Sequence, residues 1–287
     1  MGQPIGVIPL KDSATQGRPP RVTIALIVVG FLVLCWQLTL SGEDSTSPQL
    51  AAEHVSKRDQ AAIELGAIPF RLTHPGSVCG IGSEGIVCGE NDLVEAGGTV
   101  GTLIPDNLDQ VPWWLTPTTA TFLDADILHF AITMLFLWIF GVAVERLIGG
   151  ARFLLLFLVA GYGAAYAQSF VDPAATGPVI GAAGAVSGAL GAYIVLRPRG
   201  RIVTLSVVPG FGGLLLIPAA IVIAGWFALQ LIPGVGNLAS TDIASGGGAY
   251  LAHVGGFAVG VLAGWIAARS GRVRRGSTAA PGAVAAG

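Results

Sequence analysis

The stretch VIGAAGAVSGALGAY, residues 179–193, is apolar enough to lie in a membrane, yet it contains four glycines and one serine. On a helix, these glycines would form one narrow stripe without side chains, because three or four residues separate each from the next: they are Gly181, Gly184, Gly188 and Gly191. A second stripe, with strict four-residue spacing, consists of Gly256, Gly260 and Gly264. Small residues allow membrane helices to approach closely. The two stripes therefore predict that residues 179–196 pack against residues 248–268.

The composition indicates a membrane protein with several spans. Of the 287 residues, 53% are hydrophobic and only 11% are charged, whereas about 25% of the residues in a soluble domain are charged. Six segments are long and apolar enough to cross the hydrocarbon core, which takes roughly 20 residues. They are residues 22–40, 127–144, 153–168, 179–196, 214–232 and 248–268. The predicted fold class is therefore an all-α membrane protein, a bundle of six transmembrane helices.

The distribution of basic residues predicts the orientation of this bundle, because Lys and Arg stay on the cytoplasmic side. Of the 15 Lys and Arg residues, only Lys57, Arg58 and Arg71 fall on the side opposite to the two termini. Both termini are therefore expected to be cytoplasmic. The predicted organisation is a cytoplasmic lead (1–21), a membrane domain (22–270) whose long outer loop (41–126) lies partly in the interface, and a disordered cytoplasmic tail (271–287).

The basic residues also limit the partners that we expect. The cluster near the C-terminus is typical of a topology signal that contacts lipid headgroups, so the predicted partner is the lipid bilayer and not nucleic acid. The absence of any N-x-S/T site and the arginine-rich short loops favour a multi-pass protein of a bacterial inner membrane.

Two of the three cysteines, Cys79 and Cys88, flank the segment GIGSEGIV in the outer loop. An oxidising outer compartment would let them form a disulfide. Two cysteines with a single nearby histidine, His74, make a poor zinc site. We therefore expect no metal.

Polar side chains inside apolar spans are costly and often functional. His129 and Thr133 lie one turn apart in the second span, Ser187 lies in the fourth and His253 in the sixth. One interpretation is structural, a tightly packed bundle in which a buried histidine finds a local partner. In the other, packing of the glycine stripes brings His253 towards a small nucleophile, and donors around His129 stabilise an oxyanion. The residues alone leave both interpretations open.

Three segments carry a resemblance: LHFAITMLFLWIFGVAVERLIG, IGAAGAVSGALGAY and AHVGGFAVGVLAG. Together they resemble the signature helices of the rhomboid intramembrane serine proteases of bacterial type, and the resemblance covers most of residues 5–270. It implies a six-helix bundle that cleaves transmembrane segments with a serine–histidine dyad, without a metal or organic cofactor.

The resemblance also implies a role for individual positions. The catalytic base falls on His253 and one oxyanion donor on His129. The family's Gly-x-Ser-Gly motif falls on residues 181–184, so Ala183 stands at the nucleophile position and its backbone N–H at an oxyanion position. Thr133 stands in place of the asparagine that completes the oxyanion site, and Asp124 in place of a further histidine that many members carry.

These departures put catalysis in question, because alanine offers no nucleophile. Ser187 could substitute only from four residues further along the helix, about 6 Å along its axis. We therefore predict a rhomboid-family protein that binds the transmembrane helices of client proteins but is proteolytically impaired, a pseudoprotease. The alternative is an active intramembrane serine endopeptidase, in which residue 183 is an engineered Ser→Ala change or Ser187 takes the role. A transporter or channel is disfavoured, because no charged residue lies in mid-span.

Overall fold

A computed structural model describes residues 7–12, 19–40, 56–82, 85–89, 110–206, 213–230 and 250–270. Several predicted segments lie outside the described residues. They are the tail (271–287), the end of the fifth span (231–232), the start of the sixth span (248–249), and much of the lead and the outer loop.

The described part of the chain is mostly helical, and within it four helices are long and apolar enough to cross a membrane. Three of them are α1 (Arg21–Leu40), α8 (Gly150–Val171) and α12 (Tyr250–Arg269). The fourth is one continuous helix, which consists of α6 (Ile127–Phe136), the π-helical turn η2 (Leu137–Gly141) and α7 (Val142–Ile148). Two shorter apolar helices, α9 (Ala183–Leu196) and α10 (Ala219–Gln230), correspond to the predicted fourth and fifth spans. The count of six spans stays a prediction.

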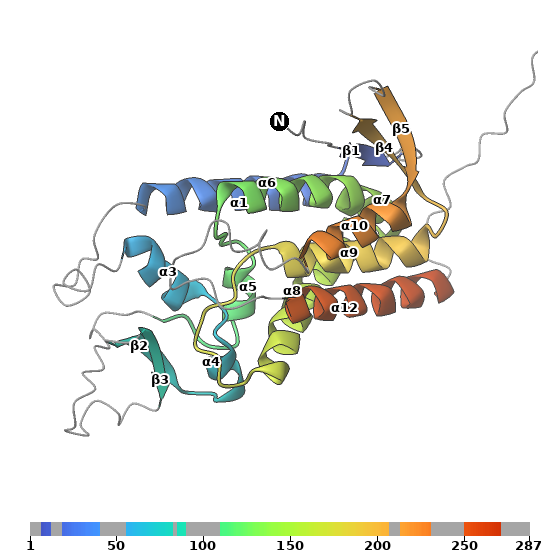
Figure 1. Cartoon of the computed structure of the whole chain (residues 1–287). Helices are drawn as coiled ribbons and strands as arrows, with labels where there is room; N and C mark the ends of the chain where they lie inside the picture. Colours follow the sequence, from blue (N-terminus) through green and yellow to red (C-terminus); the bar gives the residue numbers. More distant parts are fainter. Residues whose placement is uncertain are drawn as a thin grey trace, which may run out of the picture.

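Helix α9 is the centre of the bundle and packs directly against α8 and α12 (Figure 1). A Cβ atom at Gly256 would overlap the carbonyl oxygen of Gly184, and one at Gly260 would overlap that of Gly188. Backbone therefore lies on backbone along this contact, with no room for a methyl group. The two glycine stripes meet here, as their spacing suggests.

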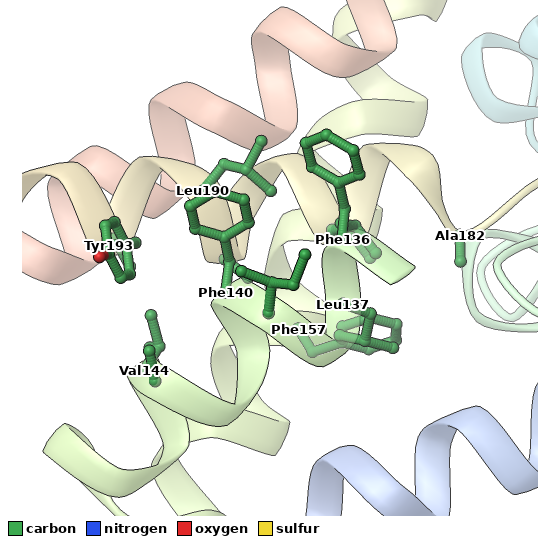
Figure 2. Close-up of a cluster of buried hydrophobic side chains, with 14 of the residues drawn as sticks. Phe136, Leu137, Phe140, Val144, Phe157, Ala182, Leu190 and Tyr193 are labelled. Carbon is green, nitrogen blue, oxygen red and sulfur yellow. The ribbon is translucent and has the colours of Figure 1, made fainter. Parts of the chain in front are cut away.

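On its other side, α9 contributes to the main hydrophobic core, shown in Figure 2. Phe140 from η2 packs edge-on against Tyr193 from α9, with ring centroids 4.9 Å apart. Leu190 from α9 and Phe157 from α8 belong to the same core and, like Phe140, are almost fully buried. This core fixes the position of α9 relative to the segment that carries His129.

A three-stranded antiparallel sheet, in the order β1-β4-β5, lies at one end of the bundle (Figure 1). Its strands are β1 (Val7–Asp12), β4 (Arg201–Ser206) and β5 (Gly213–Pro218), with Val7 opposite Ser206 and Arg201 opposite Pro218. Asp12 is buried at the end of β1, where it accepts a hydrogen bond from the Tyr193 hydroxyl (3.1 Å) and forms an ion pair with Arg197 (2.8 Å).

The sheet corrects two predictions, a purely helical fold and a fifth span that begins at residue 214. Residues 214–218 belong to β5, and α10 starts only at Ala219. A short apolar run does not distinguish strand from helix by its periodicity. Pro218 provides the physical reason, because the residue before a proline is pushed out of the helical region towards extended backbone.

The outer segment lies at the opposite end of the molecule (Figure 1). It contains α3 (Lys57–Leu65), α4 (Pro69–Thr73), the hairpin of β2 (Val78–Gly82) and β3 (Gly85–Gly89), and α5 (Thr116–Ala120). A disulfide joins Cys79 to Cys88 across the hairpin. Burial lowers the pKa of the Arg71 guanidinium, which donates to the carbonyl oxygen of Val111 (2.9 Å).

The outer segment reaches the loop in front of α9. Ala67 and Val179 exchange two backbone hydrogen bonds, of 3.2 Å and 2.9 Å, as an isolated antiparallel bridge. The outer segment therefore forms one wall around the first residues of α9.

Candidate functional site

His129 lies in the first turn of α6, at the outer end of the predicted second span. Asp126 is the N-cap of this helix, and its carboxylate accepts a hydrogen bond from the backbone N–H of His129 (2.8 Å). Asp and Ser side chains are favoured at this position because they satisfy one of the unpaired N–H groups of the first turn. The imidazole Nδ1 lies 2.7 Å from Oδ1 of Asp124.

Ala183 is the first residue of α9, and a tight turn places it there. Gly181 has φ +116°, and its N–H donates to the carbonyl of Ala120 (2.9 Å). The first helical hydrogen bond runs from Val186 to Ala182, and no side chain caps the helix. The N–H groups of the first turn, Ala183 included, therefore have no intrahelical partner.

His253 lies near the start of α12 and is 9% exposed. Trp226 from α10 packs edge-on against its ring, with centroids 5.3 Å apart. Phe136 from α6 contacts Trp226 in turn, at 5.7 Å. These rings shield His253 on the side of α10.

These three positions surround one cavity of about 90 Å³. His129, Ala183 and His253 line it, with Gly181 from the turn before α9, Gly184 from its first turn and Ala67 from the outer segment. The structure thus brings together side chains from α6, α9 and α12 that lie far apart in the sequence.

Two other candidates do not line this cavity. Ser187 is fully buried, and its hydroxyl donates to the carbonyl of Ala183 one turn back (2.7 Å). Thr133 is also buried, on the face of α6 one turn beyond His129. The arrangement therefore offers two imidazoles and the unpaired N–H groups of a helix start, but no hydroxyl at the cavity wall position 183.

Three contributors escaped the sequence reasoning. Asp124, noted there only as a departure, contacts His129 directly. Gln37 and Arg58 hold the backbone around Asp124. No motif announces Gln37 or Arg58, because they come from α1 and α3 and meet residue 124 only in three dimensions.

Comparison of the sequence with known proteins shows which family this chain belongs to. The Rhomboid domain matches residues 112–270, which is more than half of the chain and includes every cavity position from α6, α9 and α12. The chain belongs to the rhomboid family. It is accordingly a multi-pass membrane protein in a lipid bilayer, consistent with its long apolar helices.

Two relatives are similar to parts of the chain. The Rhomboid protease GluP of Bacillus subtilis is 40% identical over 111 residues, which are 37% of this chain and 20% of that protein. The mitochondrial Rhomboid protein 1 of Saccharomyces cerevisiae is 31% identical over 141 residues, 48% of this chain and 37% of that protein. The matches therefore span about a fifth and just over a third of the lengths of these relatives.

Proposed function

We propose that this rhomboid-family protein binds transmembrane segments of client membrane proteins and is proteolytically impaired. The observation that carries the proposal is the methyl group of Ala183 at the start of α9, which shares the wall of one cavity with His129 and His253. In the family that the chain resembles, this position carries the serine that attacks the client backbone.

The loss of this hydroxyl removes the covalent step. A serine–histidine pair accelerates hydrolysis because the histidine takes the hydroxyl proton as the oxygen attacks. Without the nucleophile, most of the acceleration disappears, although oxyanion donors and binding groups still contribute. Those groups are retained here as the Ala183 N–H and the His129 imidazole.

The geometry does not favour Ser187 as a replacement. Its hydroxyl is occupied by the Ala183 carbonyl and lies off the cavity wall. A misplacement of 1 Å can reduce a rate about a hundredfold. Ser187 is better explained as a hydroxyl that satisfies a carbonyl within its own helix.

A client segment needs more room than the cavity offers. Its volume is about 90 Å³, whereas ligand pockets usually measure ~300–1,000 Å³. Helix α10 is the element that would have to move, because its Trp226 covers His253 on the cavity wall and its Phe227 contacts Phe257 of the same helix α12. Binding would then expose backbone donors at the start of α9 to a client carbonyl.

The second candidate is an active intramembrane serine endopeptidase with residue 183 altered. It is favoured by the retained histidines on the cavity wall and by the similarity to a relative named a rhomboid protease. A serine at position 183 would stand on the same wall as His253.

The finer topology belongs to the same proposal. We place both termini in the cytoplasm and the protein in a bacterial inner membrane, with a lead (1–21), a six-span domain (22–270) and a tail (271–287). The client would then enter from the bilayer, near the outer face.

Labelling by a fluorophosphonate serine probe tests the proposal. The purified protein is compared with Ala183→Ser and with Ala183→Ser combined with His253→Ala. We expect no labelling of the protein as it is, and labelling of Ala183→Ser that depends on His253.

Each other outcome has a definite meaning. Labelling of the protein as it is would contradict the impaired site and make Ser187 the residue to map. A silent Ala183→Ser variant would mean that the site has lost more than its nucleophile. Capture of a photo-crosslinking transmembrane peptide by the unmodified protein tests client binding, and failure to exceed a non-rhomboid membrane protein would reject it.

A further inference from the structure

The carboxylate of Asp124 is buried, and its contact in the described structure is with one imidazole. Its side chain is 2% exposed, and Oδ1 lies 2.7 Å from Nδ1 of His129. Among the described residues, Oδ2 has no hydrogen-bond partner. A buried carboxylate without compensation is strongly unfavourable. The contact with His129 is therefore the main compensation that the described residues give to this group.

The backbone of Asp124 is held from two directions. The side-chain amide of Gln37, from α1, accepts from the Asp124 N–H (3.0 Å) and donates to its carbonyl (3.2 Å). The guanidinium of Arg58, from α3, donates to the same carbonyl (3.1 Å) and to that of Ala125 (2.7 Å). Asp124 is thus a fixed point, and the ring of His129 takes its orientation from it.

The ring is also confined on the cavity side. A Cβ atom built at Gly181 would lie 3.3 Å from Cε1 of His129, so the imidazole edge sits directly against the turn that precedes α9. With Nδ1 engaged by Asp124, the remaining ring nitrogen is Nε2.

We propose that Asp124 is a positioning residue, which holds His129 with Nδ1–H towards its carboxylate so that Nε2–H can donate to a backbone carbonyl of a bound client segment. The role of the donor rests on the function proposed above. The placement and charge of the ring do not, and they can be tested without any client.

The charge matters as well as the orientation. A neutral imidazole that carries its hydrogen on Nδ1 has only an acceptor at Nε2, and both nitrogens donate only in the protonated ring. An ionised carboxylate in direct contact stabilises that protonated ring. Asp126 caps the helix through the backbone N–H, Arg58 bonds carbonyl oxygens, and His253 lies across the cavity. Among the residues that the structure describes, Asp124 is therefore the charged group that contacts the ring itself.

The residue that departs from the family pattern thus gains a function. A histidine at position 124, as the resemblance implies for many members, could hydrogen-bond His129 but would supply no negative charge. In this chain, the Asp124 carboxylate both hydrogen-bonds His129 and supplies a negative charge. It thereby keeps a charged donor in a cavity that lacks a nucleophile.

Nitrogen NMR of 15N-histidine-labelled protein in nanodiscs tests the placement. The chain has four histidines, so the His129 signals are assigned by a His129→Gln variant. In the unmodified protein at pH 6.5, the doubly protonated fraction of His129 serves as the reference. In Asp124→Asn, that fraction should fall about threefold. The matched control Asp126→Asn keeps the N-cap acceptor and should lower the fraction less, because Asp126 acts on the ring only through its charge.

A second variant protects the test against misfolding. Asp124→His restores the residue type of the family and should also lose the doubly protonated signal, with retained thermal stability. Unchanged His129 signals in both folded variants would overturn the placement. An equal loss in Asp126→Asn would overturn it too, because the effect would then be general electrostatics.

Peptide capture tests the donor role separately. We expect a photo-crosslinking transmembrane peptide to bind Asp124→Asn about fivefold more weakly than the unmodified protein, with Asp126→Asn unchanged. If Asp124→Asn bound the peptide as tightly as the unmodified protein, Asp124 would be rejected as a determinant of client binding. If the NMR signature changes as expected but no protein captures the peptide, the placement of His129 stands and the proposed function fails.

Discussion

Residue 181 is where the backbone turns so that α9 can begin beside His129. Its φ of +116° is a backbone conformation that residues with a side chain rarely adopt, and the neighbouring imidazole leaves little room for a Cβ atom. Glycine at this position is therefore required twice, once for the turn and once for the contact.

We predict that Gly181→Ala destabilises the protein by about 2 kcal/mol, because a non-glycine residue in such a conformation costs of order 1–3 kcal/mol. Thermal unfolding in detergent measures this change. The matched control is Gly149→Ala, since Gly149 has φ +90° but no atom within 4 Å of a built Cβ.

The comparison separates strain from contact. Both variants carry the strained backbone, but only Gly181→Ala also moves His129, so only it should reduce labelling in an Ala183→Ser background. If Gly149→Ala reduced labelling equally, the contact with His129 would have no role.

At this scale, the sequence pointed to His129, Ala183 and His253, which the structure places on one cavity, while their roles stay predictions. The assembly of His129, Ala183 and His253 around one cavity agrees with a pattern of motifs that the family shares. The contact between Asp124 and His129 depends on a side-chain rotamer and on two distant residues that hold a loop. Such contacts are not encoded in any local spacing, and only the folded chain shows them.

Among the helices, α1 and α7 are joined by one buried carboxylate. Glu145 from α7 accepts hydrogen bonds from the N–H groups of Val22 (3.0 Å) and Thr23 (2.7 Å) and from the Thr23 hydroxyl (2.7 Å). These N–H groups belong to the first turn of α1, where a negative charge is favoured by the helix dipole. Glu145 therefore replaces a local cap for α1.

We predict that Glu145→Ala lowers the free energy of unfolding by about 3 kcal/mol, because it leaves buried N–H groups without an acceptor. Glu145→Gln keeps an acceptor oxygen and should cost about 1 kcal/mol. Chemical denaturation in detergent measures both. Equal losses for the two variants would mean that packing, and not the hydrogen bonds to α1, explains the role of Glu145.

The elements themselves were predictable to different degrees. Four apolar stretches near the predicted boundaries form long helices, because their hydrophobic runs exceed what a strand would use. The sheet was missed because its strands are local exceptions. Strand β1 contains Pro9, which suits an edge strand but weakens any strand prediction, and its partner β4 lies far away in the sequence.

At the scale of the whole molecule, the sheet and the disulfide-bonded outer segment lie at opposite ends of the bundle (Figure 1). If the predicted orientation holds, these ends face opposite sides of the membrane. The partly exposed Cys88 would then be accessible from outside the cell, whereas Ser270, exposed after α12, would be accessible from inside.

Labelling with a membrane-impermeant maleimide in intact cells measures this orientation. In a Cys35→Ser background, we expect Cys88 to react once the disulfide with Cys79 is reduced. In a second variant that lacks all three cysteines and carries Ser270→Cys, we expect reaction only after the membrane is opened. The opposite pattern would reverse the predicted orientation of the chain.

The pairing of strand β1 also determines when the sheet can form during biosynthesis. Val7 pairs with Ser206, so the first strand leaves the ribosome about 200 residues before its partner. At ~5–20 residues per second, that interval is roughly 10–40 s. During this time the beginning of the chain must wait unpaired while the first helices enter the bilayer, and the buried Asp12 can reach Arg197 only once α9 has been made. Closure of the sheet is therefore a late event in biosynthesis, and it requires that the central helix of the bundle has already been made.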